Sequence, residues 1–181
     1  TQDPRERPMD AQAAADAAHA RFADERSDFV AFLRLWRFWK RSAADGGSNR
    51  ARDAELKRGF LSPRRLREWG EVHSQLRSAI EELGGTPRDR SGPQGGPGGP
   101  DSASDPFAWL DGAKPDEAQL SALHQALLTG LVGTVGMRAQ DEPHYLGTHA
   151  TRFFIHPGSG LSKRGARWVM AAELVDTTRL Y

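Results

Sequence analysis

The segment from His156 to Arg167, HPGSGLSKRGAR, lies between two strand-like stretches and carries several groups that bind phosphate. It combines glycines and the hydroxyl of Ser159 with the cations Lys163, Arg164 and Arg167. Glycine allows close approach to the main chain, amides and hydroxyls donate hydrogen bonds to phosphate oxygens, and the cations supply charge. The segment therefore predicts contact with a nucleic-acid backbone. A hairpin loop that is positively charged only for solubility is the alternative.

Aromatic residues flank this segment. Phe154, His156 and Trp168 are of the types that stack on unpaired bases in single-strand-binding domains. For each of them taken singly, packing in the core is the expected role. Trp36 and Trp39 stand among arginines and lysines further upstream, and packing is the expectation for them as well.

The charges are segregated along the chain, although the formal net charge is only +1. Eleven basic and three acidic residues lie between Arg34 and Arg67, a local excess of eight positive charges. Five basic residues face two acidic ones from His144 onward, whereas residues 84–143 hold four basic and eight acidic ones. A polyanion would suit the basic blocks, because each neutralised phosphate releases counterions. A solvated helix face is the alternative.

Two segments imitate nucleotide-binding motifs without meeting their requirements. Residues 116–119, DEAQ, resemble an acidic Mg²⁺-binding box, but no buried strand precedes them and a helical pattern follows. We therefore expect these acids to complement a helix start. Residues 158–163, GSGLSK, lack the glycine before the lysine and open no predicted helix. Ser159 likewise lacks the flanking pattern of a hydrolase nucleophile.

Composition indicates a soluble, cytoplasmic protein. The 181 residues contain no cysteine, which excludes disulfides and thiolate chemistry, and 38% of them are hydrophobic. No apolar run is long enough to cross a bilayer, and the amino terminus is polar, so we expect neither membrane association nor a signal peptide. The six histidines have no spacing that suggests a metal site.

Apolar residues at three- and four-residue spacing, with capping residues and glycine stops, predict five helices. They run from Asp10 to about Phe22, Ser27 to Gly46, Ala51 to Arg58, Ser62 to Gly84 and Asp116 to Val135. Strand-like patterns cover residues 151–157 and 168–175. The expected fold class is α+β and mostly helical, with an N-terminal helical bundle and a helix leading into a partial antiparallel β module.

Glycine or proline fills eleven of the seventeen positions 84–100, which predicts a flexible linker. The aromatic and apolar residues Phe107, Trp109 and Leu110 are expected to dock on a neighbouring face. The predicted division is therefore a helical bundle at residues 1–85, a linker at 86–115, and a helix with strands at 116–181.

The chain resembles the C-terminal accessory region of bacterial HrpA-type DEAH-box RNA helicases. The resemblance rests on QDPRERP, DERSDFVAFLRLW, the helix containing residues 66–69, HQALLTGLVGTVGMR, residues 153–160 and RWVMAAELVDTTRL. It implies a helical bundle followed by the opening of an oligonucleotide-binding (OB) fold. In this family such domains pack on two RecA-like motor domains and line a channel for single-stranded RNA, which is pulled by ATP hydrolysis. A chain ending partway through the barrel leaves strand edges unpaired, so self-association or disorder beyond Tyr145 is expected.

The leading hypothesis is an RNA-binding accessory fragment that holds single-stranded RNA while a motor elsewhere in the parent chain hydrolyses ATP. The sequence contains no phosphate-binding loop, so we expect no catalytic residue, no cofactor and no activity in this chain alone, with ATP and Mg²⁺ bound by the parent motor. The alternative is a protein-interaction module that docks the motor or an acidic activator. The predicted RNA-binding residues are Arg152, Ser159, Lys163, Arg164 and Arg167, followed by Arg64, Arg65 and Arg67.

Overall fold

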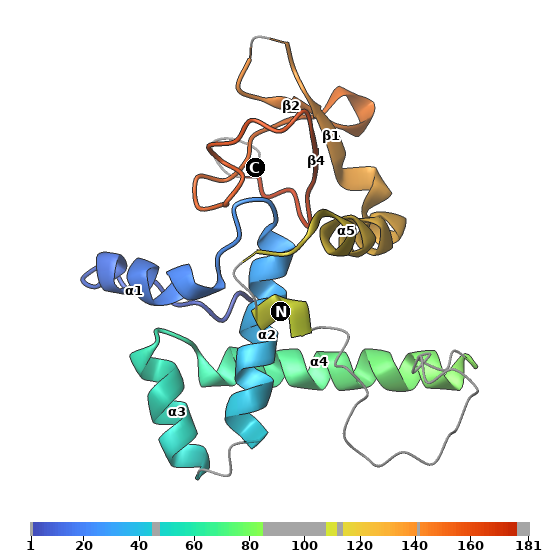
Figure 1. Cartoon of the computed structure of the whole chain (residues 1–181). Helices are drawn as coiled ribbons and strands as arrows, with labels where there is room; N and C mark the ends of the chain where they lie inside the picture. Colours follow the sequence, from blue (N-terminus) through green and yellow to red (C-terminus); the bar gives the residue numbers. More distant parts are fainter. Residues whose placement is uncertain (1, 45–47, 85–107, 112–113, 141, 177–181) are drawn as a thin grey trace. The chain divides into compact units, whose positions relative to one another are not determined.

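The computed structural model describes residues 2–44, 48–84, 108–111, 114–140 and 142–176. The chain divides into two compact units, one formed within Thr1–Arg21 and Leu35–Pro106, the other within Phe22–Arg34 and Phe107–Tyr181. The first unit is helical, and the second joins helices to a small antiparallel sheet (Figure 1). The expected class, α+β and mostly helical, is confirmed. Most of the predicted linker lies outside the described residues.

Helix boundaries in the first unit lie close to those predicted from the sequence. Helix α1 (Gln12–His19) begins after Ala11, one residue later than the predicted cap, and continues into a 3₁₀ turn (Ala20–Phe22). The hydroxyl of Ser48 accepts a 3.2 Å hydrogen bond from the Ala51 amide and so caps α3 (Asn49–Arg58). Helix α4 (Pro63–Glu82) begins with proline, which needs no amide partner there. The predicted helices are confirmed, but the Ser62 side chain does not cap α4, and the predicted glycine stop after α2 lies outside the described residues.

The core of the first unit is made by leucines that neighbouring helices and one loop bring together. The fully buried leucines are Leu35, Leu56, Leu61 and Leu66. The amino-terminal segment is tied to the loop before α4, because the Glu6 amide donates to the Phe60 carbonyl and the Ser62 amide donates to the Pro4 carbonyl, each at 2.8 Å. These bonds satisfy backbone groups that would otherwise be buried without partners.

Helix α2 (Asp28–Ala44) presents an aromatic face to α4 within the first unit. Trp39 is buried, and the ring of Trp36 lies 4.9 Å from that of His73. A Cβ atom at Gly70 would approach the Trp39 ring to 2.6 Å, so only glycine fits at this contact. Packing is therefore confirmed as the role of both tryptophans.

The second half of α4 is exposed on every side. Residues 71–84 all lie at the surface, and the exposed fractions of Leu76 and Leu83 are 60% and 87%. The apolar seam expected along the whole helix is thus packed only from Leu66 to Gly70, and beyond it the exposed His73 touches Trp36 with its ring. The sequence pattern marks a face that suits packing, but burial also needs a partner, and α4 extends beyond the elements it packs on.

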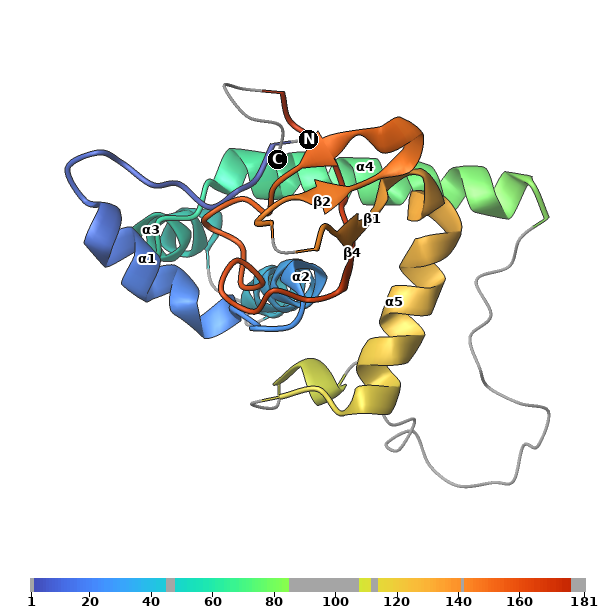
Figure 2. The same ribbon diagram turned by 90° about the horizontal axis from the view of Figure 1, so that it is seen from above.

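The second unit begins with residues 22–34, which include the first turns of α2. Val30 packs with Leu110, on a 3₁₀ turn (Ala108–Asp111), and with Leu120 of α5 (Glu117–Leu131). Leu110 is buried, which confirms the predicted apolar anchor, while Phe107 lies outside the described residues. Figure 2 shows α5 leading through a short turn into strand β1.

Helix α5 starts with a capping box at the segment that imitates an acidic nucleotide-binding motif. The Asp116 carboxylate accepts a 2.7 Å hydrogen bond from the Gln119 amide, and the Gln119 side chain accepts a 3.0 Å bond from the Asp116 amide. Each residue thereby satisfies a backbone donor that has no partner within the helix. The predicted role of these residues as a helix start is confirmed.

The sheet contains four short strands in the order β3-β2-β1-β4, with all neighbours antiparallel. The strands are β1 (Val135–Arg138), β2 (Tyr145–Leu146), β3 (Arg152–Phe153) and β4 (Trp168–Met170). Tyr145, Phe153 and Val169 form the core of one face, where the Tyr145 and Phe153 rings stack 5.8 Å apart.

Two predictions about this region are wrong in detail. The helix expected to reach Val135 ends at Leu131, and Val135 instead opens β1. The run from 129 to 136 holds three glycines, which favour helix poorly, so α5 gives way to a 3₁₀ turn (Val132–Thr134) before β1 begins. The strands expected over residues 151–157 and 168–175 are confined to Arg152–Phe153 and Trp168–Met170.

The predicted domain division at residues 1–85, 86–115 and 116–181 stays a prediction. By its contacts, however, the segment 22–34 groups with the second unit. The physical reason is the cluster of Val30, Leu110 and Leu120, which joins residues far apart in the chain.

Candidate nucleic-acid interface

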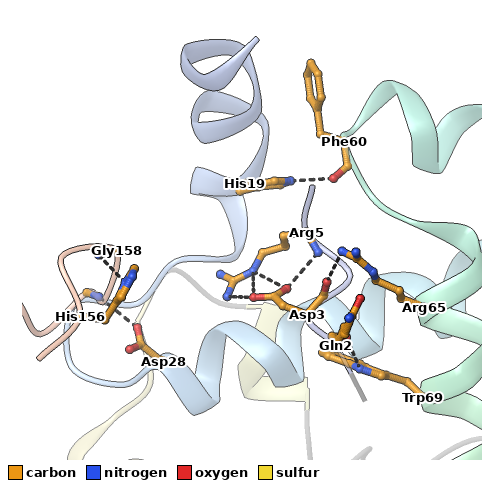
Figure 3. A network of polar contacts seen from close by, with 11 residues as sticks. Gln2, Asp3, Arg5, His19, Asp28, Phe60, Arg65, Trp69, His156 and Gly158 are labelled. Carbon is orange, nitrogen blue, oxygen red and sulfur yellow. Dashed lines mark hydrogen bonds and ion pairs between the residues drawn. The ribbon is translucent and has the colours of Figure 1, made fainter. Parts of the chain in front are cut away.

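The loop between β3 and β4 is a series of turns that no helix follows. The Ser159 amide donates to the His156 carbonyl at 2.9 Å, and the Ser159 hydroxyl accepts a 3.1 Å bond from the Leu161 amide. The His156 ring accepts from the Gly158 amide at 3.0 Å, as Figure 3 shows. Its own local hydrogen bonds therefore shape the loop. The Ser159 hydroxyl hydrogen stays available for a ligand oxygen.

The predicted cations of this region are exposed. Lys163 and Arg167 lie on the loop and Arg152 on β3, and none of these side chains forms an ion pair with a described residue. Arg164 differs, because one of its guanidinium nitrogens lies 2.8 Å from a carboxylate oxygen of Glu25. The second unit thus brings four of the predicted cations to its surface, one of them already paired.

The loop is docked on the segment that precedes α2. The Gly160 amide donates to the Asp28 carboxylate at 3.0 Å, and a Cβ atom at Gly160 would collide with the Asp24 carbonyl oxygen. Glu25 also accepts a 3.1 Å bond from Lys114. Hydrogen bonds from Lys114 and then from Arg164 hold the pKa of Glu25 below its usual value, so this carboxylate is charged at neutral pH.

One row of side chains crosses the open face of the sheet. The register aligns Met137 with Leu146 on one side and with Trp168 on the other, and it aligns Leu146 with Arg152. Residues opposite each other in antiparallel strands share a face. All members of this row are exposed, and Trp168 is 58% exposed. The row offers an aromatic ring, two flexible apolar side chains and a cation.

The expectation of core packing for the flanking aromatic residues is wrong for two of them. Trp168 and His156 are exposed, whereas Phe154 is half-buried with its ring edge-on to His144 at 6.2 Å. Strand alternation explains the exposure of Trp168, since the neighbouring Val169 takes the buried position and turns Trp168 to the other face.

Arg64, Arg65 and Arg67 lie on the first turns of α4, in the first unit. Arg64 pairs with Glu68 at 3.0 Å, and Arg67 pairs with Asp53 at 3.1 Å. The remaining arginine, Arg65, donates to the Asp3 carbonyl at 2.9 Å (Figure 3). All three therefore have partners within the chain. The structure does not place them in the same unit as the loop.

The first residue of the predicted basic block, Arg34, has a structural role. Its side chain is only 10% exposed, donates to the carbonyl groups of Leu110 and Ala23, and lies 3.8 Å from the Asp24 carboxylate. The guanidinium of Arg34 thus holds the start of α2 to the 3₁₀ turn Ala108–Asp111. A charge count along the sequence overstates the positive surface at this point.

Among the described residues, no helix is long and apolar enough to span a membrane, and no group of three histidine or acidic side chains is arranged to hold a metal ion.

Residues 123–181 match the oligonucleotide/oligosaccharide-binding (OB)-fold family. The matched stretch contains the four strands and the β3–β4 loop. Over 180 residues, 99% of the chain, the sequence is 40% identical to the ATP-dependent RNA helicase HrpA of Escherichia coli (strain K12). It is 36% identical, over the same share, to an HrpA homolog of Haemophilus influenzae. The resemblance to HrpA-type RNA helicases is confirmed. The chain spans 12% of the length of each of these relatives.

Sequence reasoning missed several residues of this candidate interface. Met137 and Leu146 were not predicted because their strands have four and two residues, too short for an alternation to be recognised. Glu25 and Lys114 were not predicted because their pairing joins segments 89 residues apart. Strand register and distant ion pairs leave no signal in a single sequence.

Proposed function

We propose that this chain is the RNA-binding accessory region of an ATP-dependent HrpA-type helicase. It holds single-stranded RNA while RecA-like motor domains elsewhere in the parent polypeptide bind ATP and Mg²⁺ and hydrolyse the nucleotide. The observation that carries this proposal is the exposed row Arg152, Leu146, Met137 and Trp168 beside a cationic loop, within the stretch that matches an OB fold.

The two surfaces have complementary tasks in this proposal. Lys163, Arg164 and Arg167 contact phosphates, and the Ser159 hydroxyl donates to a phosphate oxygen. Trp168 stacks on a base, and Met137 beside it covers the edge of that base. Neither side chain forms hydrogen bonds that distinguish one base from another, so we expect binding without strong sequence preference. Arg64, Arg65 and Arg67 contribute a secondary phosphate contact on the first unit.

A salt titration with an unstructured single-stranded RNA oligonucleotide tests the proposal. Affinity should fall steeply with salt, and Lys163→Ala and Arg167→Ala should each flatten the logarithmic slope by roughly 0.7. Trp168→Ala should weaken binding by about 1 to 3 kcal/mol with little change in slope, because stacking releases few counterions. Fluorescence anisotropy at four or more salt concentrations measures both quantities.

Lys57→Ala is the matched control, because Lys57 is an exposed lysine of the other unit. It should leave affinity and slope nearly unchanged. Equal effects of Lys57→Ala and Lys163→Ala would reduce the binding to general electrostatic attraction and contradict the proposed interface.

The second candidate function, a protein-interaction module that docks the motor or another partner, is favoured by the exposed part of α4. Val72, Leu76, Ile80 and Leu83 form an uncovered apolar stripe there. The stretch 71–82 around it carries three glutamates and one arginine, which disfavours RNA. A chain that shows no salt-dependent RNA binding, but loses association with the parent motor domains upon Leu76→Ser, would support this function over the first.

A further inference from the structure

Cationic side chains from separate segments of the second unit converge on Glu25. Arg164 from the β3–β4 loop and Lys114 from the segment before α5 both reach the same oxygen, Oε1, at 2.8 and 3.1 Å. Arg26 lies beside them, donating to Glu117 at 3.3 Å and to the Pro115 carbonyl. Glu25, Arg26 and Lys114, with Gly160 of the loop, line a shallow depression of about 360 Å³.

Arg164 and Lys114 resemble a phosphate-binding site, and the Glu25 carboxylate occupies the position that a phosphate would take. An arginine and a lysine that share one anionic oxygen are the groups that hold a phosphate oxygen, and carboxylate and phosphate accept the same charge-assisted bonds. The side chains of Glu25, Arg164 and Lys114 are 50%, 44% and 73% exposed. Ion pairs this exposed stabilise a fold only weakly, so an external anion can replace the carboxylate.

Contacts other than those of Glu25 also hold the loop in position. The Gly160 amide is bonded to the Asp28 carboxylate, and glycine allows the loop backbone to lie against the Asp24 carbonyl. Arg164 is four residues further along the same series of turns. Removing the charge of Glu25 should therefore free the two cations while leaving them in place.

We propose that Glu25 occupies a phosphate subsite formed by Arg164 and Lys114, and that a phosphate of single-stranded RNA displaces it on binding. The inference rests on the proposed function for the source of the phosphate. Its consequence is that the resident carboxylate competes with RNA, so the intact chain binds more weakly than its exposed cations would allow. Free inorganic phosphate offers the same oxygen acceptors as an RNA phosphate, so binding of inorganic phosphate is tested separately from binding of RNA.

Glu25→Gln is the decisive variant, because it keeps the shape of the side chain and removes its charge. RNA affinity at low salt should rise roughly threefold to tenfold, the range expected when two exposed ion pairs no longer compete. Asp16→Asn is the matched control, since Asp16 forms a comparably exposed pair with Arg7 in the other unit and the change in net charge is the same. It should change affinity by less than about twofold.

A double-mutant cycle then assigns the gain to the subsite. In an Arg164→Ala background, Glu25→Gln should lose most of its effect, and in a Lys114→Ala background a part of it. Equal gains from Glu25→Gln and Asp16→Asn would overturn the inference, as would a gain that survives in Arg164→Ala.

The phosphate arm separates this inference from the proposed function. Inorganic phosphate should shift the NMR signals of the Arg164 and Lys114 side chains at a lower concentration in Glu25→Gln than in the unchanged chain. If RNA does not bind but these shifts occur, the proposed function fails and the subsite stands, with free phosphate as its ligand. If RNA binds the unchanged chain but Glu25→Gln alters neither RNA nor phosphate binding, the subsite fails and the function stands.

Discussion

The hydrogen bond between His124 and Ser27 resembles a base and nucleophile, but its surroundings give it a structural role. His124 Nε2 lies 2.8 Å from the Ser27 hydroxyl, and Ser27 is only 2% exposed, so no substrate reaches it. Burial lowers the pKa of His124 below its ordinary value of 6.5. The carboxylates of Asp24 and Glu117 oppose this shift, and the Arg26 guanidinium adds to it. The ring is therefore a neutral partner that joins α5 to the start of α2.

The second unit should lose stability on mild acidification. Because the pKa of His124 is lower in the folded chain, the unfolded chain takes up the proton first as the pH falls. The contribution of His124 is complete above about pH 6.5 and is lost below it. Urea unfolding between pH 5 and 8 measures the effect as a decrease in the free energy of unfolding. His124→Gln should flatten this dependence, and parallel curves for the two proteins would contradict the assignment.

At the scale of the element, the start of α5 shows a local signal that decides structure. The side chains of Asp116 and Gln119 satisfy each other's backbone amides. Asp116→Ala should lower the free energy of unfolding by about 1 kcal/mol, because it removes the acceptor for the Gln119 amide. Chemical denaturation followed by circular dichroism measures the loss.

Asp116→Ser separates capping from any role of the negative charge. Serine also accepts at a helix start, so this variant should retain most of the stability that alanine loses. If serine and alanine destabilise equally, the charge rather than the cap is what matters at this position.

At the scale of the whole molecule, the fold depends on contacts between residues that are far apart in the sequence. Residues 22–34 contribute Val30 to a cluster with Leu110 and Leu120, although about 80 or 90 positions separate them. Val30→Ala should cost about 2 kcal/mol, from lost burial and the cavity left behind. Native-state hydrogen exchange should show the loss as reduced amide protection along α5.

Leu56→Ala is the matched control for this prediction, because Leu56 is equally buried in the first unit. It should reduce protection in α3 and α4 instead. If Val30→Ala left α5 unchanged, the grouping of residues 22–34 with the second unit would be wrong.

The sequence by itself determined the local features of this protein. Apolar periodicity predicted the five helices, and local signals fixed some of their ends, such as Asp116 before α5 and Gly59 after α3, because these signals act within a few residues. The residue types of the β3–β4 loop indicated the cationic loop, and separate sequence segments carried the resemblance to HrpA-type helicases. Whether the predicted cations touch RNA stays a prediction.

Only the tertiary structure decided which of these side chains are available. It bonded Arg34 to the carbonyl groups of Leu110 and Ala23, paired Arg164 with Glu25, exposed Trp168 in a row with Met137, and left the end of α4 at the surface. Exposure and pairing depend on residues that are distant in the chain and close in space. The type of a residue and its neighbours in the sequence therefore do not specify its exposure or its partners. An arginine can bind a ligand in one environment and form a structural hydrogen bond in another.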